Sequence, residues 1–135
     1  MSRGFFEAIV DAFDFSRFRC IVEVGGGQGQ LLGSILARHP GSKGILYDVP
    51  EIVAGALAVL RAHGVADRCE AVGGDMFRSV PQGGDAYLLT RVSLDHADAK
   101  LSMILGACRL AMGATGRLIV IERIMPFTMP IGVPV

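Results

Sequence analysis

The sequence has little charge, and neither sign of charge is clustered. Only 19% of its 135 residues are charged, and 13 basic residues balance 13 acidic ones. DNA and RNA are bound through concentrated basic surfaces, so this composition argues against a nucleic-acid partner. The high hydrophobic content of 51% and the mean hydropathy of +0.48 favour one folded domain with a sheet buried on both faces.

Long apolar runs are also missing. No stretch of about 18 apolar residues occurs, so the sequence contains no candidate membrane-spanning helix. Glu7 and Asp11 lie where a signal peptide would need its apolar segment. We therefore expect a cytoplasmic protein with no membrane partner.

Cysteine pairs of the kind that bind metals are absent. Cys20, Cys69 and Cys108 are odd in number and far apart, with no C-x-x-C spacing and no neighbouring histidine. We predict three reduced core residues and no metal site.

Short segments rich in β-branched and aliphatic residues alternate with longer segments of helical periodicity. This alternation is typical of βαβ units around a parallel sheet and predicts an α/β fold. The predicted strands span residues 20–24, 43–47, 69–72, 86–90 and 118–122.

Three apolar stripes at helical spacing lie between these strands, and each is expected to cover one face of the sheet. They consist of Leu31, Leu32, Ile35 and Leu36; of Ile52, Val53, Leu57 and Leu60; and of Leu101, Ile104, Leu105 and Cys108. Pro40 and Gly41 end the first helix, Pro50 suits the first turn of the second, and Gly64 follows the second.

The two ends of the chain differ from this core. Residues 5–13 are amphipathic and predict a further helix, within residues 1–18, that leads into the first strand. Three prolines in the last residues exclude a regular helix or a central strand, so residues 125–135 are expected to form an irregular tail. The predicted core spans residues 1–124.

A glycine-rich loop, EVGGGQG at residues 23–29, joins the first strand to the first helix. Glycine allows a sharp turn and a close approach to a ligand, and a helix start offers free N–H groups, so a nucleotide-type ligand is predicted. The dinucleotide pattern G-x-G-x-x-G does not fit, because Gln30 or Leu32 would take its last position. The pattern acid-x-G-x-G-x-G does fit, and it is the loop of class I methyltransferases. The alternative is a tight turn without a ligand.

Asp48 closes the second predicted strand. At the edge of the crevice of a doubly wound sheet, a carboxylate accepts hydrogen bonds from ribose hydroxyls. The alternative is that Asp48 caps the helix that begins at Pro50, and the two roles are compatible.

Five segments in this order resemble the plant and bacterial O-methyltransferase family of caffeate, acetylserotonin and polyketide-tailoring enzymes. They read VEVGGGQG, YDVPEIV, GDMF, VPQGGDAYLLTRV and GRLIVIERIMP, and the resemblance covers nearly all of residues 5–126. It implies a Rossmann-like class I methyltransferase core with a doubly wound parallel sheet. It also implies S-adenosylmethionine as cofactor, S-adenosylhomocysteine as product, and a hydroxyl on an aromatic or polyketide-like small molecule as acceptor.

The resemblance also implies roles for individual residues. Gly25 and Gly27 would pass under the methionyl tail of the cofactor, and Asp48 would bind its ribose.

Gly74, Asp75 and Met76 would form the adenine pocket, and Arg91 would close the site from the fourth strand. A flat apolar base needs a soft packing surface and one acceptor, which Met76 and Asp75 supply. Plain core packing is the alternative for Met76 and Phe77.

The sequence departs from the family where the catalytic base is expected. In the family a histidine removes the proton from the acceptor hydroxyl, but Leu94 occupies this position and His96 follows two residues later. His96 is the candidate base only if the loop is rewound. His39 and His63 are predicted to be ordinary helix-end residues.

The family also carries an amino-terminal helical domain and further strands after the fifth, which these 135 residues do not include. We therefore expect a core truncated after the fifth strand. Two functions remain open, a methyltransferase and a non-catalytic module that keeps the fold; a nicotinamide dehydrogenase is disfavoured by the glycine spacing. The apolar fifth strand, as an open sheet edge, predicts a homodimer or larger oligomer.

Overall fold

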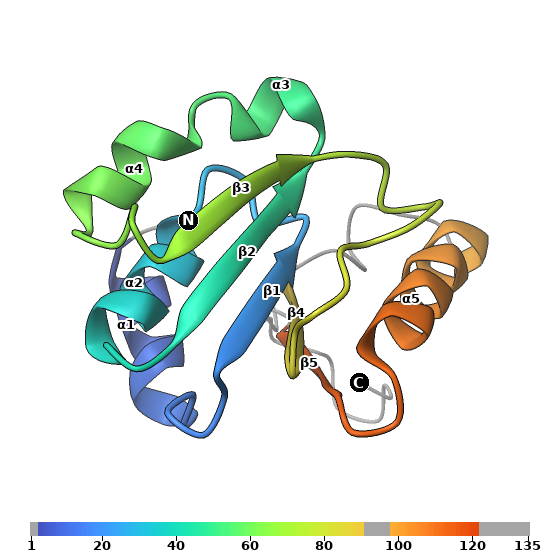
Figure 1. Cartoon of the computed structure of the whole chain (residues 1–135), viewed down its shortest axis with the longest axis horizontal. Helices are drawn as coiled ribbons and strands as arrows, with labels where there is room; N and C mark the ends of the chain where they lie inside the picture. Colours follow the sequence, from blue (N-terminus) through green and yellow to red (C-terminus); the bar gives the residue numbers. More distant parts are fainter. Residues whose placement is uncertain (1–2, 91–97, 122–135) are drawn as a thin grey trace, which may run out of the picture.

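The computed structural model describes residues 3–90 and 98–121, which fold around one five-stranded parallel sheet (Figure 1). The strands are β1 (Cys20–Val24), β2 (Lys43–Asp48), β3 (Cys69–Gly73), β4 (Ala86–Thr90) and β5 (Arg117–Ile121), in the spatial order β3-β2-β1-β4-β5. The α/β prediction is confirmed. β1 and β4 match their predicted ranges, β2 and β3 are one residue longer, and β5 begins one residue earlier, while Glu122 lies outside the described residues.

The strand order reverses at β1, which pairs with β2 on one side and β4 on the other. At such a reversal the loops leaving the two neighbouring strands turn to opposite faces of the sheet, and a crevice opens at the carboxyl ends of the strands. The glycine loop follows β1 directly, so the topology places it at this crevice.

Helices cover both faces of the sheet. They are α1 (Arg3–Ala12), α2 (Gln30–Arg38), α3 (Pro50–Val53), α4 (Ala56–Ala62) and α5 (Asp98–Met112). Side chains of α1, α2 and α4 pack on one face with Ile21, Leu46 and Leu88, whereas α5 packs on the other face with Val22, Tyr87 and Leu89 (Figure 1).

The first predicted stripe is confirmed, because all four of its residues on α2 are buried. His39 and His63 are the C-cap residues of α2 and α4, as predicted. Arg68 stabilises the end of α2: its guanidinium donates to the carbonyl oxygens of Leu36 and Ser42 at 2.8 and 2.6 Å.

The second predicted stripe is wrong in part. The segment forms two short helices, α3 and α4, and Ile52 and Leu57 are 40% and 51% exposed. Leu60 is buried as predicted and Val53 packs partly against the core, whereas Ala56, four residues before Leu60, takes the core position expected for Leu57. Splitting the helix lets α3 follow the end of β2 while α4 covers the sheet. In the third stripe Ile104 and Cys108 are buried as predicted, and Leu105 packs partly against the same core cluster.

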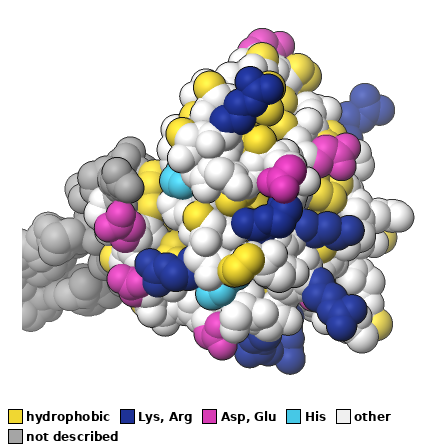
Figure 2. Space-filling view, turned by 60° about the vertical axis from the view of Figure 1, so that its left-hand side comes forward, with side chains coloured by type: hydrophobic (Ala, Val, Ile, Leu, Met, Phe, Trp, Pro, Cys, Tyr) yellow, Lys and Arg dark blue, Asp and Glu magenta, His cyan; other side chains and the backbone are white. Residues whose placement is uncertain are grey.

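The described surface carries both signs of charge side by side (Figure 2). Lysine and arginine side chains alternate with acidic ones on the face shown there, in agreement with the charge balance of the sequence. Within residues 3–90 and 98–121, no helix is long and apolar enough to cross a membrane.

Candidate functional site

The glycine loop is held against the end of β2 by its own backbone. Gly25 and Gly27 have φ angles of 74° and 66°, a left-handed conformation that disfavours residues with a Cβ. The N–H groups of Gly25 and Gly26 donate to the carbonyl oxygen of Tyr47 at 2.8 and 3.4 Å. The N–H of Gly27 donates to Oδ2 of Asp48 at 2.9 Å.

Free N–H groups were predicted at the start of the helix, and the loop before the helix does not add to them. Three consecutive N–H donors point into the protein and already have acceptors on β2. Pyrophosphate-binding loops work by presenting such donors to the anion. The geometry therefore suits a ligand that lies on the loop through close packing rather than one held by its phosphates.

Asp48 is a buried carboxylate, 7% exposed, at the end of β2. Its Oδ2 accepts from Gly27, and its Oδ1 accepts from the N–H of Val49 at 2.7 Å. The N-cap of α3 is Val49, and no side chain caps that helix. The helix-cap alternative for Asp48 is therefore wrong, and the structure shows Asp48 supporting the loop.

Gly74 and Asp75 follow β3 at the same edge of the sheet. The N–H of Gly74 donates to the carbonyl oxygen of Asp48 at 3.0 Å, which links the end of β3 to the end of β2. Gly74 has no room for a Cβ, because the hydroxyl of Tyr47 lies against it. Both residues line a cavity of about 730 Å³, and Oδ1 of Asp75 accepts from the N–H of Phe77 at 3.0 Å.

Met76 is 7% exposed and lies in the core cluster on the α5 face, with Tyr47 and Val80. Phe77 packs partly against the same cluster, and Nζ of Lys100 lies 5.5 Å from its ring centroid. Core packing thus describes Met76 in this structure, and a contact between Met76 and adenine stays a prediction.

Glu23 is the residue that sequence reasoning left without a role. It is 2% exposed, and its Oε1 has no hydrogen-bond partner. A Cβ on Gly26 would lie 2.7 Å from its carboxyl carbon, so Glu23 is directly behind the loop. Burial is the main cause that raises the pKa of Glu23 to about 8, and the nearby Asp48 adds to it. An acid within the apolar strand CIVEV was a visible signal.

The remaining predicted site residues, Arg91 and His96, lie outside the described residues, as does Leu94. In the part of the chain that is described, no group of three or more His, Cys, Asp or Glu side chains is placed to hold a metal. Cys20 and Cys108 are buried and Cys69 is half-buried, and burial raises the pKa of the Cys69 and Cys108 thiols to about 12 and about 11. They are neutral core thiols.

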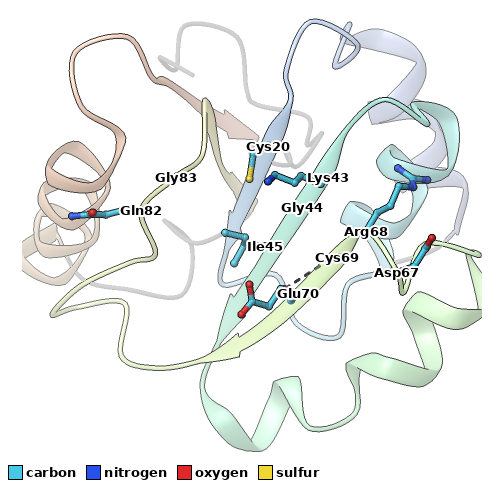
Figure 3. A pocket seen from close by; sticks show the side chains of 10 residues that line it. All are labelled: Cys20, Lys43, Gly44, Ile45, Asp67, Arg68, Cys69, Glu70, Gln82 and Gly83. Atoms are coloured by element: carbon cyan, nitrogen blue, oxygen red, sulfur yellow. Dashed lines mark hydrogen bonds between the residues drawn. The ribbon is translucent and has the colours of Figure 1, made fainter.

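A second cavity, of about 530 Å³, lies away from the glycine loop. Its lining includes Cys20, Lys43 and Cys69, which are the first residues of β1, β2 and β3, together with Gln82 (Figure 3). It therefore lies at the amino ends of the strands, whereas Asp48 and Asp75 lie at their carboxyl ends.

The family model for the O-methyltransferase domain matches residues 3–130. Phenazine O-methyltransferase PhzM from Lysobacter antibioticus is 44% identical over 88% of this chain and 35% of its own length. Phenazine-1-carboxylate N-methyltransferase from Pseudomonas aeruginosa is 39% identical over 93% of this chain and 37% of its own length. The chain thus spans about a third of the length of these curated relatives.

Solved structures agree with this relationship. The crystal structure of LaPhzM superimposes with a TM-score of 0.87 at 41% identity, covering 95% of this chain and 39% of that one. CalO1, a methyltransferase in calicheamicin biosynthesis solved in its SAH-bound form, has a TM-score of 0.83 at 35% identity, covering 95% of this chain and 38% of that one.

Proposed function

This chain belongs to the O-methyltransferase domain family, and we propose that it forms the cofactor-binding part of an S-adenosylmethionine-dependent methyltransferase. The acceptor is a hydroxyl of an aromatic or polyketide-like small molecule. The Pseudomonas aeruginosa relative is named as an N-methyltransferase, so a nitrogen acceptor is a variant of this proposal. Assays with both oxygen and nitrogen acceptors distinguish the two. The observation that carries the proposal is the buried Asp48 carboxylate bonded to Gly27 of the loop.

The described residues fit this cofactor. Gly25, Gly26 and Gly27 present no side chains to a ligand and their N–H donors are already used, and two buried carboxyl groups, Glu23 and Asp48, are beside them. An acidic environment suits a cofactor with cationic groups better than one with a pyrophosphate. In our proposal the methionyl tail lies over Gly25 and Gly27, and Asp48 accepts from the ribose.

The adenine would lie at the edge that Gly74, Asp75 and Met76 form, with Arg91 closing the site. When bound, S-adenosylmethionine supplies a methyl group on a sulfonium that a nucleophile can displace. The protein then has to align the acceptor, and alignment alone accounts for a large share of such rate enhancements. A general base adds typically about 10²- to 10⁴-fold.

Leu94 at the expected base position favours a second candidate, a non-catalytic module that binds the cofactor without turnover. His96 is the base in the first candidate if the loop brings it to the acceptor. Slow methylation that is lost in His96→Ala would support that role.

Two further predictions belong to the proposal. Pairing through the edge strand β5 would make the chain a homodimer or larger oligomer. The second prediction is a cytoplasmic location, which fractionation of expressing cells tests.

The proposal predicts that S-adenosylhomocysteine binds the chain and raises its melting temperature, while NAD does not. Asp48→Ala should weaken binding by about 1.5 to 3 kcal/mol, because a charged acceptor is lost. Isothermal titration calorimetry measures both effects. Stabilisation by NAD alone would refute the methyltransferase assignment.

Two controls separate binding from loop support. Asp48→Asn removes the charge but leaves one acceptor oxygen for the N–H groups of Gly27 and Val49. Weaker binding in this variant reports a contact with the ligand if its melting temperature without ligand equals that of the unmodified chain. Asp67→Ala removes an exposed carboxylate at the other edge of the sheet and should leave affinity unchanged. Saturable binding without methylation of phenolic or amine acceptors would identify the non-catalytic module.

A further inference from the structure

Glu23 is a buried acid that neither the fold nor the proposed contacts explain. Its carboxyl group is near the start of α2, where the backbone N–H of Leu32 lowers its pKa, and its Oε1 has no hydrogen-bond partner. Leu46 and the carboxyl group of Glu23 both lie where a Cβ on Gly26 would be. The carboxyl group of Glu23 and the side chain of Leu46 therefore both lie next to Gly26 of the loop.

The surroundings of Glu23 disfavour a second negative charge. On β2, the Asp48 carboxylate raises the pKa of Glu23, although burial is the larger cause. On β3, the Cys69 thiol is the titratable group whose pKa Glu23 raises. On β4, the residue paired with Glu23 is the apolar Leu88. Among the described residues no Lys, Arg or His contributes to the pKa of Glu23. Burial, the unpaired Oε1 and the nearby Asp48 thus all favour the neutral form of Glu23.

We propose that Glu23 couples cofactor binding to proton release and so makes the site select the sulfonium cofactor over its product. This inference rests on the proposed function. A cation bound over the loop would stabilise the ionised form of Glu23, and the carboxyl group would lose its proton to the solvent. S-Adenosylmethionine carries a sulfonium charge that S-adenosylhomocysteine lacks. The preference for the cofactor over the product should therefore increase as the pH rises.

Calorimetry in two buffers of different ionisation enthalpy counts the released protons. At pH 7 we expect about half a proton or more per bound S-adenosylmethionine, and clearly less for S-adenosylhomocysteine. Between about pH 5.5 and 7.5, below the ionisation of the ligands' amino groups, the ratio of the two affinities should rise about threefold or more. Glu23→Gln should abolish both effects, whereas Glu70→Gln, an exposed carboxylate on β3, should retain them.

Carbon-detected NMR of the Glu23 carboxyl carbon supplies a test in the unmodified chain, which does not depend on the folding of a variant. The titration midpoint should be near 8 in the free protein and shift to lower pH with S-adenosylmethionine. Binding without proton release, or a free midpoint near the ordinary glutamate value of about 4.3, would overturn this inference alone. Failure of both ligands to bind would instead refute the proposed function.

Discussion

At the scale of single residues, two carboxyl groups contact the glycine loop, and their environments differ. Asp48 holds Gly27 through a 2.9 Å hydrogen bond, whereas Glu23 lies behind Gly26 with one oxygen unpaired. A buried acceptor without a partner costs stability, and a buried unpaired charge costs more. Glu23 therefore lowers the stability of the fold, and its ionised form would lower it further.

This cost predicts a pH dependence of stability. Glu23 has a pKa of about 8 in the folded chain and an ordinary, lower pKa when unfolded, so the folded state binds more protons between these values. The free energy of unfolding should fall by about 1.4 kcal/mol per pH unit as the pH rises through this window. Glu23→Gln should remove this slope in urea denaturation, while Glu70→Gln keeps it. Parallel curves for Glu23→Gln and the unmodified chain would show that Glu23 is ionised in the fold.

At the scale of elements, the segment between β2 and β3 shows how packing selects among apolar residues. Leu57 and Leu60 are both leucines on α4, but Leu57 is 51% exposed and Leu60 is 1% exposed. Leu60 packs in the core cluster with Leu46 and also lies against Gly29, next to the loop. The core face of α4 thus supports the sheet and the glycine loop together.

Alanine substitutions on α4 measure this difference. Leu60→Ala should lower the free energy of unfolding by about 2 to 5 kcal/mol, because it removes a fully buried side chain. Leu57→Ala, the matched control on the same helix, should change it by less than about 0.5 kcal/mol. Chemical denaturation checks both values, and equal costs at the two positions would contradict the observed burial.

At the scale of the whole molecule, the sheet formed by residues 3–90 and 98–121 has two edge strands, β3 and β5. β5 has the sequence RLIVI, and Val120 on it is 51% exposed. An apolar edge strand is a template for pairing with another chain, and its only charged residue in this range, Arg117, is at its start. This exposed edge is the physical basis of the proposed oligomer.

Light scattering at micromolar concentration tests that assembly. We expect a dimer or larger species, with slow amide exchange along residues 117–121, and Val120→Lys should shift it towards monomer. Leu57→Lys, an equally exposed leucine on another face, is the control and should leave the mass unchanged. A monomer whose β5 amides exchange freely would refute the proposal.

The sequence by itself determined the order of strands and helices, the buried face of α2, the place of the glycine loop and the family. These features depend on short-range periodicity, on capping residues and on motifs that stand in one segment. Pro50 at the start of α3 and Gly64 after α4 are such local signals, and both were found where predicted.

Only the tertiary structure decided what the site residues contact. Asp48 lies 21 residues from Gly27 in sequence, and its choice between capping α3 and bonding the loop depends on how β1 and β2 pair. The burial of Met76 and the burial that raises the pKa of Glu23 likewise follow from residues of other elements packed around them. Local patterns such as the acid within CIVEV mark a residue as unusual, but they do not determine its partners, because long-range packing is set only when distant segments come together.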